Sequence, residues 1–190
     1  MLGEGLVRGL YTPHSTLMES HVSGLWDNSG MDKTDKNLIG AAGEHLVLSR
    51  LLAMGLLASQ APRGTRKADI LVNPLDGGRP VLIQVKTTAG SNTRAGWHMN
   101  VKHESIKDTD LFYCFVNLQV KHPDVYVIPA LVVAKTIKNI HTNWLKTPGA
   151  KGQQHNDNDM RMISNRPRLE TKKVPDGWMD KYLENWDQLR

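Results

Sequence analysis

Two runs rich in branched apolar residues lie on either side of one turn-rich segment, and this feature constrains the fold more than any other. The runs are Ala68–Val72 and Val81–Thr88, and the segment between them reads Asn73-Pro-Leu-Asp-Gly-Gly-Arg-Pro80. Val, Ile and Leu at this density favour strands, whereas Asn, Pro, Asp and Gly favour turns. We therefore predict a β-hairpin, and with it a sheet as the centre of the fold.

The register of this hairpin decides which side chains meet. If Val72 pairs with Val81, Asp69 lies opposite Gln84. Side chains alternate between the two faces of a strand, so Gln84 and Lys86 share a face and Asp69 joins them there. A slip of one residue would reverse this arrangement. The opposite face then carries apolar side chains suited to a core: Ile70, Val72, Ile83 and Val85.

A helix is predicted before the hairpin, over Thr34–Met54. Thr34 or Asp35 can cap its start, and Gly55 suits the position just after its end. Gly40 and Gly43 each cost about 1 kcal/mol in a helix relative to alanine, which suggests close packing of this turn against a neighbouring backbone or a ligand. The predicted apolar stripe consists of Leu38, Ala41, Ala42, Leu48, Leu51 and Leu52.

Further elements follow the same logic of apolar runs and turn residues. Strands are predicted at Leu56–Gln60, Leu111–Leu118 and Val125–Ile128, and helices at Ala130–Ile140 and, at the end of the chain, Trp178–Leu189. Pro148–Asp159 is predicted to be a polar loop. The order is helix, three strands, a variable stretch, two strands and a helix. It indicates an α/β or α+β domain around a mixed sheet.

The domain organisation follows from where this regularity begins and ends. Residues 1–30 are interrupted by Gly and Pro, so we expect an irregular N-terminal extension, either preceding a natural start at Met31 or forming an ordered arm. The domain itself is expected at 31–145. Residues 146–190 are expected to be a C-terminal extension that packs on the same domain.

Composition narrows the classes of partner and compartment. The net charge is +5 and the sequence pI is about 9.4, which favours a polyanion such as DNA, RNA or an acidic membrane surface. Cys114 is the one cysteine, so an intrachain disulfide and a thiolate zinc cluster are excluded; we expect a buried thiol and a cytoplasmic setting. No apolar stretch approaches the ~20 residues of a membrane span.

Asp, Gln and Lys converging on one sheet face have two interpretations. One is a solvated face with a surface Asp–Lys pair, which contributes little stability. The other is a hydrolytic site, in which the Asp69 carboxylate and the Gln84 amide oxygen hold Mg²⁺. Lys86 would then orient or deprotonate the attacking water, or stabilise the charge that develops on phosphorus.

The same residues resemble the motifs of a nuclease superfamily. Asp69 followed by Gln84-Val-Lys86, with Gly40-Ala-Ala-Gly43-Glu44 in the preceding helix, resembles the PD-(D/E)xK nucleases, in particular restriction-endonuclease-like and Holliday-junction-resolvase-like members. The resemblance covers Leu38–Lys86 and implies an αβββαβ core with a central mixed sheet flanked by helices. It implies a metal-dependent endonuclease that hydrolyses phosphodiester bonds of DNA, with Mg²⁺ or Mn²⁺ as cofactor and a possible homodimer as the assembly.

The resemblance also implies a role for each matching residue. Asp69 corresponds to the main metal ligand, Lys86 to the catalytic lysine, and Glu44 to a carboxylate in or beside the metal site. Gln84 occupies the acidic position of the third motif, where restriction enzymes that cleave modified DNA also carry a glutamine. The lost negative charge should weaken metal binding, so a non-catalytic nucleic-acid-binding module on a degenerate nuclease fold stays open as the alternative.

Basic residues flank the hairpin on both sides, and the cluster after it also contains His98, His103 and Lys107. Such residues are either solvated or in contact with phosphates, and we expect phosphate contacts from Arg63, Arg66, Lys67, Arg94 and Lys102. Trp97 is expected to pack rather than to stack on a base. The run His155-Asn-Asp157-Asn-Asp159 lacks the ligand spacing of an EF-hand and is interpreted as a polar loop.

Overall fold

The structure is a computed structural model that describes residues 33–190, apart from Arg63, Arg66, Asp76 and residues 90–95, 119–121, 168–173 and 190. The predictions for residues 1–30, and for phosphate contacts by Arg63, Arg66 and Arg94, therefore lie outside the described residues. None of the described helices is both long enough and apolar enough to cross a membrane.

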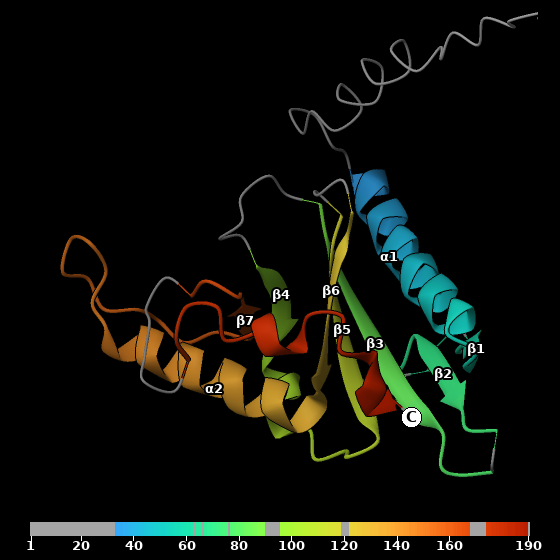
Figure 1. The fold of residues 1–190 in the computed structure, drawn as a ribbon. Helices are drawn as coiled ribbons and strands as arrows, with labels where there is room; N and C mark the ends of the chain where they lie inside the picture. The colour runs from blue at the N-terminus through green and yellow to red at the C-terminus, as the bar shows by residue number, and fades with distance from the viewer. Residues whose placement is uncertain are drawn as a thin grey trace, which may run out of the picture. The chain divides into compact units, whose positions relative to one another are not determined.

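A mixed five-stranded sheet forms the centre of the fold (Figure 1). Its strand order is β1-β2-β3-β5-β6, and all neighbours are antiparallel except β3 and β5, which are parallel. The predicted α/β fold with a mixed central sheet is confirmed. The elements of the sheet and its helices are α1 (Lys33–Ala53), β1 (Leu57–Gln60), β2 (Ile70–Asn73), β3 (Val81–Thr88), β5 (Leu111–Asn117), β6 (Asp124–Pro129) and α2 (Ala130–Lys146).

Each face of the sheet is covered by a different set of elements. Helix α1 lies against one face, where its Val47 and Leu51 join the inward residues of the strands in one core. Helix α2 lies on the opposite face, where Val133 and Ile137 pack with Phe115 in a second core. Cys114 belongs to the first core and is fully buried, and burial raises the pKa of its thiol. Two covered faces explain why β5 is apolar at nearly every position.

The end of α1 is as expected, but its apolar stripe is not. Gly55 adopts φ 77°, and the N–H of Leu56 bonds to the carbonyl of Leu51 at 3.0 Å, which closes the helix. The predicted stripe is wrong at four of its six positions, because Leu38 and Leu52 are 65% and 50% exposed and both alanines face solvent. Leu51 is buried and Leu48 packs against the core as predicted. The buried line recurs every four residues at Gly43, Val47 and Leu51, so it shares only Leu51 with the predicted stripe.

The connection between the parallel strands β3 and β5 contains two elements that the sequence did not reveal. Strand β4 (Trp97–Asn100) pairs with the distant β7 (Met160–Ile163) in a separate two-stranded sheet. The 3₁₀ helix η1 (Val101–Ser105) follows β4 directly, where an αβββαβ core would place an α-helix. Trp97 packs as expected, because it is 6% exposed and its Nε1 donates to the Val116 carbonyl at 3.0 Å.

The predicted C-terminal helix over Trp178–Leu189 is wrong. The chain forms two short 3₁₀ helices instead, η2 (Asp180–Tyr182) and η3 (Trp186–Leu189). Glu184 interrupts them with φ 49°, where its side chain pairs with Arg50 of α1 and accepts from the N–H of Val125 at 2.9 Å. These contacts to α1 and β6 hold Glu184 in a left-handed conformation that a continuous α-helix cannot contain, so they override the local helix propensity.

The polar loop before β7 uses its side chains to anchor the chain. Asp157 Oδ1 lies 2.7 Å from His141 Nε2 of α2, and Asn158 Oδ1 accepts from the N–H of Met160 at 2.8 Å. The ring of His155 stacks on Trp144, with centroids 4.0 Å apart. These contacts account for three of the five residues in the run His155–Asp159 without a metal.

Candidate active site

The register of the hairpin is the one predicted from the sequence. Val72 pairs with Val81 and Ile70 with Ile83. Strand β2 begins at Ile70, so Asp69 precedes it, but the N–H of Asp69 still bonds to the Ile83 carbonyl at 2.8 Å and continues the ladder. Asp69 therefore lies beside Gln84, at the point where β2 and β3 separate.

The Asp69 carboxylate accepts a hydrogen bond from β3 that a backbone carbonyl of a longer β2 would otherwise accept. Beyond Ile83, β3 continues without β2 beside it, and the N–H of Val85 donates to Asp69 Oδ2 at 2.7 Å. Val85 itself is buried in the core beneath α1, which places Gln84 and Lys86 on the other face of β3. The bond holds one oxygen of Asp69 against β3.

Helix α1 brings Glu44 to the same place through Gly43. A Cβ at position 43 would overlap Thr87 Oγ1 and lie 2.8 Å from Thr87 Cγ2, so only glycine lets α1 approach β3 this closely. Burial raises the pKa of Glu44, and the charge of Asp69 raises it further, against the opposing effects of His45 and Lys86. Glu44 and Asp69 are thus close enough to repel each other.

Lys86 lies among charged groups of both signs. Burial lowers its pKa most, and the nearby ammonium of Lys102 lowers it as well, whereas Asp69 and Glu44 act in the opposite direction. In the sheet, Lys86 is aligned with Phe115 and Gln84 with Tyr113 on the parallel strand β5. The hairpin, α1 and η1 therefore all contribute charged groups to one site.

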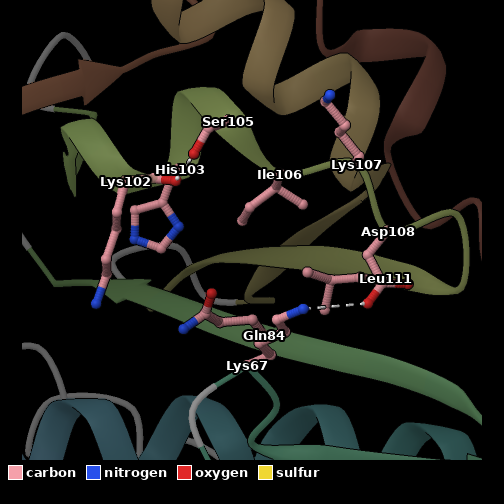
Figure 2. Close-up of a pocket in the computed structure, with 9 residues that line it drawn as sticks. All are labelled: Lys67, Gln84, Lys102, His103, Ser105, Ile106, Lys107, Asp108 and Leu111. Atoms are coloured by element: carbon pink, nitrogen blue, oxygen red, sulfur yellow. Dashed lines mark hydrogen bonds and ion pairs between the residues drawn. The ribbon is translucent and has the colours of Figure 1, made fainter.

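A basic cleft of about 980 Å³ lies beside these residues (Figure 2). Gln84 lines it from β3, Lys102 and His103 hang from η1 above it, and Lys67 closes it from the segment before Asp69. The Nζ of Lys67 lies 3.9 Å from Asp108 Oδ2 across the cleft. The other lining residues are Ser105, Ile106, Lys107 and Leu111.

The oxygen donors of the site fit a hard cation. They are the carboxylates of Glu44 and Asp69 and the amide of Gln84, and Mg²⁺ takes one or two carboxylates while keeping several waters. A cation between the two carboxylates would also relieve the repulsion that raises the pKa of Glu44. Within the described part of the chain, no group of three His, Cys, Asp or Glu side chains gathers as a metal site. A cation held by these two acids would therefore need Gln84 and water as its further ligands.

The structure brings the sequence-predicted residues together only in part. Besides burial, the charges of Asp69 and Lys86 act on the pKa of Glu44, those of Asp69, Lys102 and Glu44 act on the pKa of Lys86, and the cleft adds Gln84 and Lys67. Sequence reasoning missed Tyr113, which lies in an apolar run, and named His103 only as one member of a basic cluster. The available signal was the hydroxyl of Tyr113, which lies at a position aligned with Gln84. Recognising this signal required knowing that β3 and β5 are parallel neighbours.

Comparisons with known proteins add one structural likeness. No protein family model matches the chain, and no curated protein matches it in sequence. Among solved structures, the chain is similar to a bacterial homing endonuclease, I-Ssp6803I, with a TM-score of 0.45 and 15% identity over 80% of this chain and 91% of that one. The strand order itself places α1 before an antiparallel β1-β2-β3 unit, with β5 parallel to β3.

Proposed function

We propose that this protein is a metal-dependent endonuclease that hydrolyses phosphodiester bonds of DNA. The observation that supports the proposal most is the convergence of Asp69, Gln84 and Lys86 with Glu44 where β2 and β3 separate. If Asp69, Gln84 and Lys86 formed only a solvated sheet face, nothing would explain why a glycine lets α1 pack directly against β3 beside Glu44. The proposal assigns Glu44, Asp69, Gln84 and Lys86 to the catalytic site.

The residues of the site have complementary chemical roles. Asp69, Glu44 and the Gln84 amide oxygen would hold Mg²⁺, or Mn²⁺ in its place, which when bound lowers the pKa of a coordinated water and offsets phosphate charge. The bond from Val85 N–H keeps Asp69 in one orientation. Because burial and Lys102 lower the pKa of Lys86, a larger fraction of its amine is unprotonated at neutral pH than for a surface lysine, and an unprotonated Nζ would be available to take a proton from the attacking water.

DNA is the proposed substrate because the cleft is basic and open. Lys67, Lys102 and Lys107 line it, and the chain carries a net charge of +5. Cations beside a phosphodiester release counterions from DNA and so add affinity that does not depend on sequence. Cleavage of both strands would need either two successive events or a homodimer.

The experiment that tests the proposal is cleavage of supercoiled plasmid by the purified protein. We expect nicked or linear DNA with Mg²⁺ or Mn²⁺ and none in excess EDTA. A parallel assay on RNA and on single-stranded DNA tests the substrate class. Equal cleavage in EDTA, or no cleavage of any nucleic acid across a range of metal concentrations, would contradict the proposal.

A second candidate is a nucleic-acid-binding module that has lost catalysis. Gln84 favours it, because the position carries an amide where the resembling nucleases have a carboxylate. Such a module should bind a short DNA duplex equally well with Mg²⁺ and with EDTA, and should not cut it. Binding that tightens with metal, followed by cleavage, excludes this candidate.

Gln84→Glu is expected to strengthen metal binding at the site. A third carboxylate beside Asp69 and Glu44 should lower the Mg²⁺ concentration for half-maximal cleavage by about tenfold, which corresponds to about 1.4 kcal/mol. The measurement is a metal titration of the plasmid assay. Gln153→Glu is the matched control, because it changes the net charge equally in a distant loop and keeps the oxygen that accepts from the N–H of Lys151. A Gln84→Glu titration that coincides with wild type would remove Gln84 from the metal site.

A further inference from the structure

A buried hydrogen bond connects η1 to the sheet beside the proposed site. His103 Nδ1 and Tyr113 Oη are 2.5 Å apart, and the two rings meet edge to face with centroids 5.7 Å apart. His103 is 6% exposed and Tyr113 is fully buried. Because Tyr113 is aligned with Gln84 in the sheet, this bond places His103 opposite the hairpin.

The protonation of the two rings determines the direction of this bond. Burial and the charges of Lys86 and Lys102 lower the pKa of His103 to about 4, so the imidazole is neutral near pH 7. Burial and the charge of Asp69 raise the pKa of Tyr113, which therefore keeps its proton. The Tyr113 hydroxyl then donates to Nδ1, and the single ring proton of His103 is on Nε2.

The η1 helix is held firmly at both ends of its turn. Asn100 Oδ1 accepts from the N–H of Lys102 at 3.0 Å at the start of η1. Glu104 forms an ion pair with Arg161 of β7, whose side chain is 4% exposed. From this support the side chains of Lys102 and His103 both extend toward Gln84 (Figure 2). One charged donor and one neutral donor are thus presented side by side to the cleft.

We propose that Lys102 Nζ and His103 Nε2–H bind one phosphate of the DNA strand in the cleft, and that Tyr113 is the positioning residue that keeps the His103 proton on Nε2. An anion fits here because the two η1 side chains that carry nitrogen donors into the cleft are Lys102 and His103, while Glu104 of the same helix is paired with Arg161. A neutral donor beside a lysine binds a phosphoryl oxygen without adding a charge close to Lys86. This inference rests on the proposed nuclease function and names the residues that would orient its substrate.

The salt dependence of DNA binding separates the two donors. Binding of a short duplex in EDTA is measured at several salt concentrations for wild type, Lys102→Met, His103→Leu and Tyr113→Phe. Lys102→Met should weaken binding and reduce the slope of log K against log salt concentration by about 1. His103→Leu should weaken binding by up to about tenfold with an unchanged slope, because a neutral donor releases no counterion. Lys138→Met, an exposed lysine on α2, is the matched control for Lys102 and should keep both wild-type values.

The tautomer is read directly from the ring nitrogens by NMR. In the free wild-type protein we expect a protonated Nε2 and an unprotonated Nδ1 at His103, and a mixture of tautomers in Tyr113→Phe, which keeps the ring volume. Tyr113→Phe should also weaken duplex binding without changing its salt slope. A proton on Nδ1 in wild type, a reduced slope in His103→Leu, or wild-type binding by both His103→Leu and Tyr113→Phe would overturn the proposal.

Neither measurement requires cleavage, so the two proposals can fail separately. A wild-type protein that cuts no DNA but shows these binding and tautomer effects keeps the phosphate site and loses the nuclease assignment. A wild-type protein that cuts DNA, with variants that bind as it does, keeps the nuclease assignment and loses the phosphate site.

Discussion

Asp69→Asn is expected to remove metal-dependent cleavage while leaving the fold intact. The substitution keeps the shape of the side chain and an oxygen that can accept from the N–H of Val85, now 2.7 Å from Asp69 Oδ2. It removes one of the two carboxylates that would hold the metal. Loss of a group that only supports a metal ligand costs about 10–100-fold, so loss of a ligand should cost more than about a hundredfold in the cleavage rate.

Two measurements distinguish this result from loss of structure. The rate of plasmid nicking gives the effect on catalysis. Calorimetric measurement of Mn²⁺ binding gives the effect on metal affinity at the site. Thermal unfolding should show a melting temperature near that of wild type. Asp176→Asn is the matched control, because it is the same change at an exposed position 3.9 Å from Arg166. If Asp69→Asn cuts within tenfold of wild type, Asp69 is not a metal ligand.

The second large effect is expected at Gly43, where a single methyl group should both destabilise the fold and impair the site. In Gly43→Ala the new Cβ would overlap Thr87, whose branched side chain cannot move away from the core. Overpacking costs about 1–3 kcal/mol and the gain in helix propensity returns about 1 kcal/mol, so the free energy of unfolding should fall by up to about 2 kcal/mol. Urea denaturation measures this difference. The same displacement of α1 would move Glu44, so the cleavage rate per folded molecule should also fall.

Gly40→Ala is the control on the same helix. A Cβ at Gly40 would meet nothing within 4 Å, so this variant should gain about 0.5–1 kcal/mol from helix propensity alone. The two alanine substitutions, one turn apart, are thus predicted to have opposite signs. Adding Thr87→Ala to Gly43→Ala should recover part of the lost stability. Equal stabilisation by both glycine substitutions would show that α1 does not press on β3 at Gly43.

The hairpin and its register were predictable because the information is local. A turn-rich segment between two runs of Val, Ile and Leu determines which residues pair, and alternation then determines which side chains share a face. The observed partners Val72 and Val81 are those predicted. Gly55 was predictable for the same reason, since the residue just after a helix commonly adopts the left-handed conformation that favours glycine.

The errors on α1 and at the C-terminus have a different cause. Small and apolar residues occur on two sides of α1, and periodicity alone selected the side with more leucines. The buried side contains Gly43, which contributes no apolar surface but allows the closest approach to the sheet. Near the C-terminus, Glu184 interrupts the predicted helix because its carboxylate is bound by Arg50 and by the backbone of Val125. These partners lie far away in the sequence.

The sequence by itself predicted the strands of the central sheet, the hairpin register and the four residues proposed for the catalytic site, Glu44, Asp69, Gln84 and Lys86. Only the tertiary structure decided what surrounds them. The pairing of β4 with β7, the parallel alignment of β3 with β5, and the bond between His103 and Tyr113 each join segments separated by other elements. Local patterns specify which backbone conformation a segment prefers. The neighbours of a side chain depend on which distant surfaces pack together, and that choice minimises the free energy of the whole chain.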